Sequence, residues 1–540
     1  MIATKLRLVL PMFASFTRKE QCLLLLCSVF TFALRIPLAF RSVAALTSFP
    51  YGDDAYYVFS IAKNLALGHG LSVDGQHLTN GFQPLIVFLY TPIFWLTAPN
   101  AWLAIRWTFV LNGLIAGLSV WAVARLIQSC ERFGSPEVLP RVLDKRLSHP
   151  GQSASLISLS PPLVGAMLWT ASSSIYVHTT NGLETGLYSL MLLIAMTVYV
   201  RLRVDEKAGK NVPLARWSVL GFVLGFTVLS RIDGAILAAV MVFAEYLRGR
   251  VRGGLLVGAV SFAVSAPWWV YNLIYFGSLM PTSGQSENSW FAPLSLNIYR
   301  LVQTLDDVAL VLFYTPDKLS MFLRVASGAV LLLLLYLLLR RIKFLEYLKS
   351  REYPRILWPF AVFCFALVVY YTFFLEAPHF ILRFLQPLRI LWLVLVALCT
   401  PFVVRAYREL PSLRRVAARL SLGAFVIFSI GFGIDRYAYR FQDTSREEFY
   451  KMGMWSKEHP SEKIGMLQSG IASFVAPNVI NLDGKVNAAA LRAHQQGQFA
   501  EYLRDEHFTY IADWKPFIED IAAIARKDSL FFDSVGMVDK

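Results

Sequence analysis

Charged side chains are scarce in this sequence. Only 16% of its 540 residues are Asp, Glu, Lys or Arg, whereas 56% are hydrophobic. Soluble domains are typically about 25% charged. This composition excludes an ordinary soluble enzyme, and the long apolar runs predict a polytopic membrane protein.

Cysteine is also scarce, with five residues. Four of them lie inside apolar runs and one lies at the edge of a basic loop. None falls in a segment that we expect outside the cell, so no disulfide framework is predicted. The first apolar run lacks a small-residue cleavage site, so we expect a retained span and not a signal peptide. The cysteines are Cys22, Cys27, Cys130, Cys364 and Cys399.

The common catalytic signatures are missing. There is no P-loop, no Gly-x-Ser-x-Gly elbow and no dinucleotide-binding fingerprint. His69 and His77 are too loosely spaced from any other His or Cys to form a metal site. We therefore expect no cofactor and no metal ion.

Acidic residues are outnumbered, with 36 Asp and Glu against 51 Lys and Arg, a formal net charge of +15. The basic residues gather in short loops between apolar runs, which is the positive-inside pattern. The charge therefore predicts orientation, with a cytoplasmic N-terminus, and not a nucleic-acid partner. The clusters are Lys5, Arg7, Arg18 and Lys19; Arg201, Arg203, Lys207 and Lys210; Arg248, Arg250 and Arg252; Arg340, Arg341, Lys343, Lys349, Arg351 and Arg355; and Arg405, Arg408, Arg414, Arg415 and Arg419.

The apolar runs predict an all-α membrane bundle of roughly 11 to 13 transmembrane helices over residues 1–434. The run 84–127 most simply forms two spans. Two spans, however, would place the basic loop 129–155 on the outer side, against the positive-inside rule. One of the two runs is then re-entrant or lies along the membrane, and the sequence does not say which. The other runs are 21–40, 161–176, 187–200, 217–229, 235–247, 255–275, 321–339, 356–375, 384–404 and 421–434.

From Asp435 onward the composition changes. KIGML, VINLDG and FTYIADW are typical of short strands, and the stretches 489–506 and 515–527 are typical of helices. About 100 residues are enough for one small domain. We predict a C-terminal α/β domain over 435–540, outside the cytoplasm.

The polar stretch 51–84 carries Asp53 and Asp54 directly before an amphipathic helix. That helix is expected to lie along the membrane surface or over the bundle, and to end at Gly68 and Gly70 because glycine accepts the left-handed conformation. Either carboxylate is alternatively a cap for this helix. The apolar stripe of the helix is Val58, Ile61, Ala62 and Leu65.

Further charges lie at the expected outer ends of spans. Charges at membrane depth usually face a wet cavity or pair with one another. Glu184 in the turn HTTNGLETG is alternatively a carboxylate at a helix start. Instead of belonging to a functional site, Arg231 and Asp233 in SRIDG can form a structural pair with each other. Arg35 can likewise be a snorkelling arginine at the membrane interface. The remaining two are His379, structural when taken alone, and Arg383, whose planar fork suits phosphate.

Four motifs in order resemble one class of enzymes. GDDAYYVFSIAKNLALGHG followed by TNGFQPL resembles the first outer loop of the GT-C integral-membrane glycosyltransferases, which include protein O-mannosyltransferases, lipid A aminoarabinose transferase and arabinofuranosyltransferases. NGLETGL resembles their second acidic motif. FGSLMPTSG is similar to a Pro-Asn-Thr/Ser loop of bacterial members, and VINLDGKVN to a segment of an extracytoplasmic domain. Where such loops often carry a lysine after PTSG, this chain has Gln285 and Asn288.

The resemblance implies an inverting transfer of a sugar from a polyprenyl-phosphate donor to a hydroxyl of a glycan, lipid or protein acceptor, at the outer face of the plasma membrane. It implies Asp53 as general base, Asp54 as its orienting neighbour, and Glu184 as a group that holds acceptor or donor. A departing phosphate needs cations, and we expect Arg383, with Arg231 or Arg35, to supply them. The other expected substrate contacts are His69, Asn80, Gln83 and His379.

A rival hypothesis is a transporter or lipid-binding protein that uses the same cavity without bond chemistry. Transport would favour internal repeats and charges near mid-span. The sequence shows no repeat, and its acids lie at span ends. A third hypothesis is an inactive scaffold that carries the C-terminal domain as a binding module.

Overall fold

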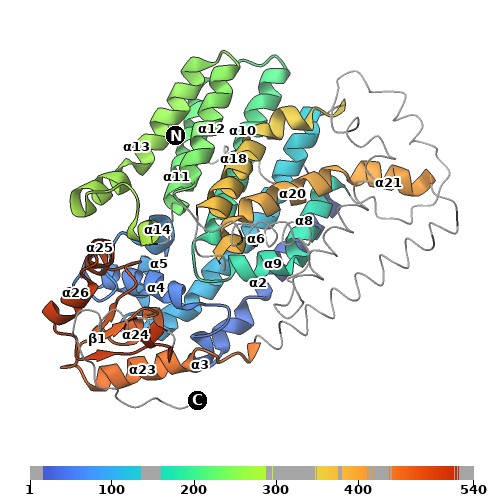
Figure 1. Ribbon diagram of the computed structural model, residues 1–540. Coiled ribbons are helices and arrows are strands. Elements are labelled where there is room, and N and C mark those ends of the chain that lie inside the picture. The colour runs from blue at the N-terminus through green and yellow to red at the C-terminus, as the bar shows by residue number, and fades with distance from the viewer. Residues whose placement is uncertain are drawn as a thin grey trace.

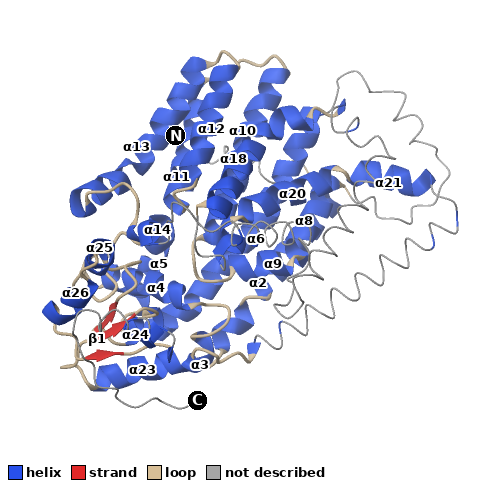
Figure 2. Ribbon diagram, viewed as in Figure 1, coloured by secondary structure: helices blue, strands red, loops and turns tan. Residues whose placement is uncertain are grey.

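The computed structural model describes residues 16–134, 160–286, 350–374, 380–409 and 441–515, with isolated positions between and after these ranges. Two predicted spans, 321–339 and 421–434, and the candidate His379 lie outside the described residues. Figures 1 and 2 show a bundle of helices with a small mixed domain at one end. The prediction of an all-α bundle followed by a small α/β domain is confirmed.

The bundle is made of long apolar helices. Five stretches in the described ranges are long and apolar enough to cross a membrane, which agrees with a multi-pass membrane protein. They are α2 (Arg18–Ala33) continued by η2 (Ile36–Phe40), α6 (Ala101–Gly134), α10 (Thr185–Lys207), α13 (Val251–Phe276) and α18 (Tyr353–Phe373). The shorter helices beside them are α8 (Pro161–Ala171), α9 (Ser173–Thr179), α11 (Leu214–Ser230), α12 (Gly234–Leu247), α20 (Gln386–Leu398) and α21 (Thr400–Glu409). The predicted number of spans stays a prediction.

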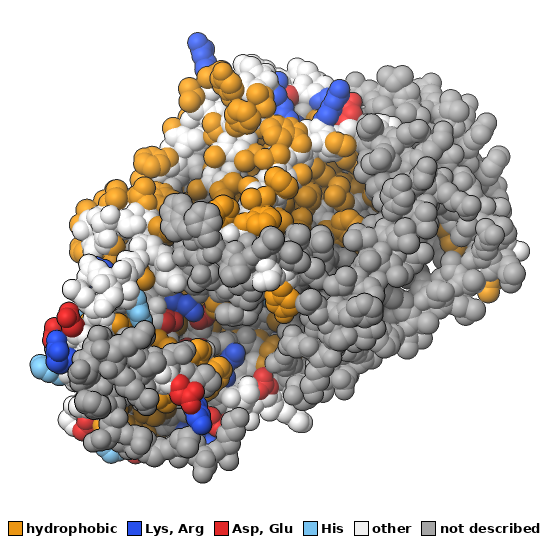
Figure 3. All heavy atoms as spheres, in the orientation of Figure 1, with side chains coloured by type: hydrophobic (Ala, Val, Ile, Leu, Met, Phe, Trp, Pro, Cys, Tyr) orange, Lys and Arg blue, Asp and Glu red, His pale blue; other side chains and the backbone are white. Residues whose placement is uncertain are grey.

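Hydrophobic side chains cover the middle of the bundle surface, and Lys and Arg lie at the end farthest from the C-terminal domain (Figure 3). Inside, small residues let helices approach closely. A Cβ added at Gly221 would lie 2.7 Å from the Val257 carbonyl oxygen, and one at Gly225 would lie 2.5 Å from Val264 Cβ. Helices α11 and α13 therefore pack backbone to backbone, as is common in membrane bundles.

Helix α5 (Pro84–Thr97) settles the conflict over the run 84–127. Its 14 residues span about 21 Å, less than the roughly 30 Å of a bilayer core. Both of its ends lie near the C-terminal domain. A Cβ added at Gly81, just before α5, would lie 1.8 Å from the Lys485 carbonyl oxygen, and Phe94 near the other end contacts the ring of Phe474. Of these two helices α6 alone runs through the bundle, from Trp102 beside Phe474 to a last turn that carries Arg132 and lies against Arg351, at the end opposite the C-terminal domain.

The C-terminal domain holds a three-stranded parallel sheet in the order β2-β1-β3. The predicted strands are confirmed, whereas the predicted helix 489–506 is two helices, because Gly497 adopts a φ of 68° between them. The elements are α23 (Glu447–Glu458), β1 (Ile464–Met466), α24 (Gly470–Val475), β2 (Val479–Asn481), α25 (Ala488–Gln496), α26 (Phe499–Asp505) and β3 (Tyr510–Ile511).

Helix α4 (Asp53–Ala66) lies between the bundle and this domain (Figure 1). The predicted apolar stripe faces the core, and Gly68 and Gly70 follow the helix with φ of 84° and 80°. On its other side, Lys63 Nζ donates to the Phe474 carbonyl at 2.7 Å, and Tyr57 contacts Ser469 at 3.2 Å. Nearly every face of α4 is therefore buried, which fixes the direction of its first turn. Nearby short helices are α3 (Val43–Leu46), α14 (Thr282–Ser286) and α19 (Ile381–Phe384).

Candidate active site

A cavity of about 160 Å³ lies where the bundle meets the C-terminal domain. It is bounded by the first turns of α4 and α10, the link between α11 and α12, α14, the end of α18, α19 and the segment after β2. The volume is that of about five water molecules. Its charged lining residues are Asp54, Glu184, Arg231, Asp233, Arg383 and Lys485, and Gln83 also lines it. Asp54, Glu184, Arg231, Asp233 and Arg383, which were expected to meet, therefore line one cavity at one end of the bundle.

Asp53 lies outside this lining and has another function in the fold. Its two carboxylate oxygens accept hydrogen bonds from the backbone N–H groups of Gly470 at 2.9 Å and Ile471 at 2.8 Å, at the start of α24. Burial raises the pKa of Asp53 to about 6, although those two hydrogen bonds favour the ionised form. The expected general base is thus turned away from the cavity.

The alternative that Asp53 or Asp54 caps its own helix is wrong. The N-cap of α4 is Gly52, and no side chain caps this helix. Asp53 instead caps a helix 417 residues later in the chain. No local pattern in the sequence indicates such a partner.

Asp54 and Arg383 face each other across the cavity. Asp54 Oδ2 lies 3.8 Å from Arg383 Nη1, and the two side chains are 30% and 16% exposed. Arg383 also stacks on Phe380 and Phe384, each with its ring centre 4.9 Å from the guanidinium carbon. Its Nε makes no hydrogen bond within the described residues. Both groups therefore keep capacity for a ligand.

Arg231, in contrast, has every nitrogen engaged. Nε lies 2.5 Å from Asp233 Oδ2, Nη1 lies 3.3 Å from Glu184 Oε1, and Nη2 donates to Tyr371 Oη at 2.9 Å. The Tyr371 hydroxyl in turn donates to Asp233 at 2.6 Å. The alternative of a structural pair is thus present, widened to a network that includes Glu184. These contacts hold the guanidinium group of Arg231 within the network and leave one N–H on each of its two Nη atoms.

Glu184 is the N-cap residue of α10, but its side chain makes no capping hydrogen bond. It pairs with Arg231 instead and is only 6% exposed. Gln83 also contacts the link between α11 and α12, because its Oε1 accepts a hydrogen bond from the Ile232 N–H at 3.2 Å. The link between α11 and α12 is therefore held from two sides.

Three other candidates lie away from the cavity lining. Arg35 is buried and donates to the Thr31 carbonyl at 2.7 Å and to Thr179 Oγ1 at 2.8 Å, so it joins helices and neither snorkels nor reaches the cavity. Asn80 is fully buried, and its Oδ1 accepts the N–H of Thr282 in α14. His69 is exposed beyond the far end of α4, about 20 Å from its first turn.

Lys485 is the lining residue that the sequence analysis missed. It follows β2, and its carbonyl accepts a hydrogen bond from Thr282 Oγ1 at 2.8 Å. Its Nζ lies 3.7 Å from Asp483 Oδ2 and 5.1 Å from the ring centre of Phe380. Burial raises the pKa of Asp483. The only hint in the sequence is the Gly-Lys turn in VINLDGKVN, because the PTSG loop itself has no lysine.

Comparisons with known proteins give matches in structure alone. No family model matches the chain, and no curated protein matches it significantly. Two similar solved structures are crystal structures of ArnT from Cupriavidus metallidurans, one bound to undecaprenyl phosphate and one in the apo state. The first is 11% identical with a TM-score of 0.43, over 88% of this chain and 79% of that one. The second is 12% identical with a TM-score of 0.44, over 88% and 78%.

ArnT is a GT-C glycosyltransferase, the class that the motifs of this chain resemble. Both TM-scores lie below 0.5, so this likeness supports no conclusion about the function of the chain.

Proposed function

We propose that this chain is an inverting GT-C glycosyltransferase that moves a sugar from a polyprenyl phosphate to an acceptor hydroxyl. The observation that carries the proposal is the pair of Asp54 and Arg383, 3.8 Å apart and partly exposed in one cavity. A base and a phosphate-binding cation are the two groups that this transfer requires.

We assign the general base to Asp54 and not to Asp53. Asp54 lines the cavity, whereas both oxygens of Asp53 are used by α24. The acceptor hydroxyl loses its proton to the Asp54 carboxylate as its oxygen bonds to the anomeric carbon of the donor sugar. The bond from that carbon to the phosphate oxygen breaks, and its electron pair leaves with the polyprenyl phosphate.

Arg383 and Lys485 are proposed to stabilise the charge that develops on the departing phosphate. Arg383 offers a fork that matches two phosphate oxygens. Lys485 replaces the lysine that the PTSG loop lacks, since its backbone lies against Thr282 of that loop. The ring of Phe380 lies within cation–π distance of the charged ends of both side chains and so holds them near each other.

Glu184 is proposed to hold the sugar or the acceptor, with Arg231 as its positioning residue. The ion pair to Arg231 holds the Glu184 carboxylate in place at the cavity wall. The hydrogen bond from Tyr371 to Asp233 fixes the other side of Arg231.

The position of the cavity supports a lipid-linked donor at the outer face of a plasma membrane. It lies at the end of the bundle opposite the basic loops, which the positive-inside rule assigns to the cytoplasm. Exposed apolar side chains adjoin it, among them Leu279 at 51%, Phe373 at 42% and Phe374 at 41%. They offer a surface for an isoprenoid tail beside the charged pocket.

The test compares Asp54→Asn with Asp53→Asn in the purified full-length chain. Transfer is measured as release of polyprenyl phosphate from polyprenyl-phosphate sugars extracted from membranes. We expect Asp54→Asn to lose about 10²- to 10⁴-fold in rate, the usual value of a general base. Asp53→Asn should stay within a few-fold of the parent chain.

The opposite ranking would refute the assignment of the base. If the parent chain binds the donor but never releases polyprenyl phosphate, the rival hypothesis of a lipid-binding protein without bond chemistry is favoured. The melting temperatures of both variants are measured as a control. If they equal that of the parent chain, a loss of transfer does not come from unfolding.

A further inference from the structure

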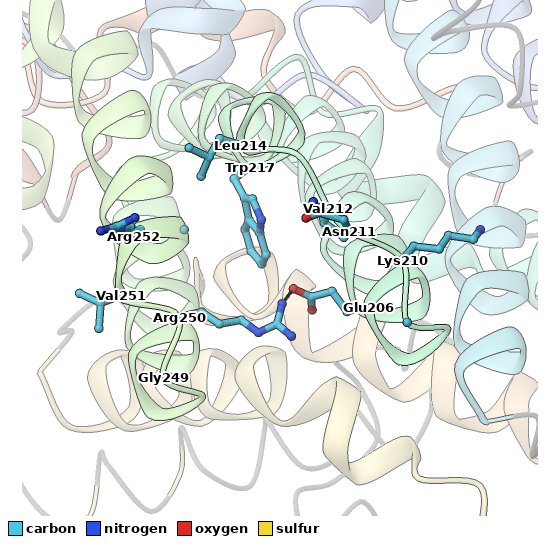
Figure 4. Close-up of a pocket in the computed structure, with 12 residues that line it drawn as sticks. Glu206, Lys210, Asn211, Val212, Leu214, Trp217, Gly249, Arg250, Val251 and Arg252 are labelled. Atoms are coloured by element: carbon cyan, nitrogen blue, oxygen red, sulfur yellow. Dashed lines mark ion pairs between the residues drawn. The ribbon is translucent and has the colours of Figure 1, made fainter.

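A second cavity, of about 700 Å³, lies at the other end of the bundle. It is formed by the end of α10, the start of α11, the end of α12 and the start of α13 (Figure 4). Helix α10 has 23 residues and is about 34 Å long, so the two cavities are separated by the thickness of a bilayer. This cavity is independent of the transfer site proposed above.

Cationic side chains surround the cavity. Three cations and one carboxylate are among its lining residues, namely Lys210, Arg250, Arg252 and Glu206. Lys210 is paired with Asp205 at 2.9 Å. Arg252 has no ion-pair partner among the residues that the structure describes, so its charge is available to a ligand.

A network of buried ion pairs holds Arg250 in place. It pairs with Glu206, and Glu206 also pairs with Arg203, whose Nη1 lies 3.1 Å from Glu245 Oε2. Glu206 and Glu245 have side chains that are 8% and 1% exposed. Figure 4 shows Arg250 reaching across the cavity to Glu206, with Arg252 on the wall beside it. Arg250 is therefore anchored on a buried network, whereas Lys210 and Arg252 are exposed at the rim of the cavity.

Trp217 supplies a further donor. Its side chain is 4% exposed and lines the cavity, and no described residue accepts a hydrogen bond from its indole N–H. In Figure 4 the indole ring lies between Leu214 and Arg250. Ring contact with Gly253 is close, since an added Cβ there would lie 3.4 Å from the ring. The indole N–H is not among the buried polar atoms that lack a partner, so water reaches it from the cavity and a ligand can accept from it.

We propose that this cavity binds the phosphate group of an anionic membrane lipid. Arginine forks and a donor N–H suit phosphate oxygens, and basic pockets between transmembrane helices bind lipid head groups. Two lining residues, Leu214 and Val251, are 56% and 44% exposed, and Leu255 beside them is 63% exposed. A ligand with a phosphate next to acyl chains meets both surfaces, whereas free phosphate meets only the first.

The experiment measures lipid binding to the purified full-length chain in neutral detergent by native mass spectrometry. The probes are dioleoyl phosphatidylglycerol, the zwitterionic dioleoyl phosphatidylcholine, and inorganic phosphate in a parallel thermal-shift titration. The parent chain is compared with Arg252→Ala, the double variant Lys210→Ala with Arg252→Ala, and Trp217→Phe. The matched control is Arg355→Ala, which removes a charge at the same end from a side chain that is 76% exposed and outside the lining.

We expect phosphatidylglycerol to bind the parent chain and phosphatidylcholine to bind it at least tenfold more weakly. Each cation near an anionic head group contributes about a fivefold factor, so the double variant should bind about 25-fold more weakly. Trp217→Phe should lose about tenfold, the value of one hydrogen bond to a charged group.

Three outcomes would overturn the proposal. Equal binding of both lipids would remove the role of charge. A loss in Arg355→Ala as large as that in Arg252→Ala would mean that surface charge acts without a site. Saturable stabilisation by inorganic phosphate that phosphatidylglycerol does not reproduce would identify a soluble phosphate compound as the ligand.

Discussion

Acidification is expected to tighten the contact between α4 and the C-terminal domain, because the pKa of Asp53 is raised by burial from its ordinary 3.8 to about 6. The folded protein therefore binds this proton at a higher pH than the unfolded chain does. The resulting stabilisation is complete below pH 3.8 and is lost as the pH rises through 6. Its full size is about 3 kcal/mol, and about half of it is present at pH 5.

Asp53→Asn isolates this effect. Other groups at the same interface also titrate: burial raises the pKa of Asp483 and of Asp513, and it lowers the pKa of Lys63 to about 8. Their contributions are common to the parent chain and the variant, so they cancel in the difference. The variant keeps one acceptor oxygen for α24 and cannot ionise.

The assay is hydrogen exchange of the backbone amides of α24 in the full-length chain, corrected for the intrinsic effect of pH. Protection in the parent chain should fall about tenfold more between pH 5 and pH 8 than in Asp53→Asn, since 1.4 kcal/mol is a tenfold factor. Asp505→Asn, which changes a 71% exposed carboxylate in the same domain, should behave as the parent chain. An identical pH profile in the parent chain and Asp53→Asn would refute the reasoning.

Three further variants test the cavity. Arg231→Ala should lower the free energy of unfolding by about 3–5 kcal/mol, because it leaves two buried carboxylates without their cation; chemical denaturation measures this. Tyr371→Phe should cost about 1–3 kcal/mol and lower the transfer rate, because Asp233 loses one of its two donors and Arg231 Nη2 loses its acceptor; melting and turnover measured on the same sample separate the two effects. Gly81→Ala would place a Cβ 1.8 Å from the Lys485 carbonyl oxygen and should reduce transfer, whereas Gly258→Ala, with its nearest contact at 3.4 Å, should not.

The sequence predicted those parts of the fold that depend on local periodicity. The stripe of Val58, Ile61 and Ala62 predicted α4, and the two glycines after it predicted its end. The meeting of Asp54, Glu184 and Arg383 could be predicted because apolar helices of similar length bring their outer ends to the same level. The sequence could not predict that Asp54 pairs with Arg383 and Glu184 with Arg231. These pairs depend on the direction of each side chain, and the position of a transmembrane span does not give that direction.

Errors arose where a residue contacts a distant segment. Arg35 is buried because Thr179 and the ring of Tyr176, both in α9, receive its guanidinium group. Hydropathy alone cannot distinguish this position from a snorkelling one. The run 84–97 is apolar enough for a span, but it is short, and contacts of Gly81 with Lys485 and of Phe94 with Phe474 place both of its ends beside the C-terminal domain.

Asp53 and Asp54 have different partners because their side chains leave α4 in different directions. Successive residues of a helix point about 100° apart, so Asp53 meets α24 while Asp54 meets the cavity. The C-terminal domain is held by the first acid and, through Lys485, forms a wall of the pocket that contains the second. The predicted boundary between residues 434 and 435 lies outside the described residues, and we do not expect a separable activity on either side of it. A chain without residues 435–540 would lose Lys485 and leave Asp53 without its donors, so the membrane bundle alone is not expected to carry out transfer.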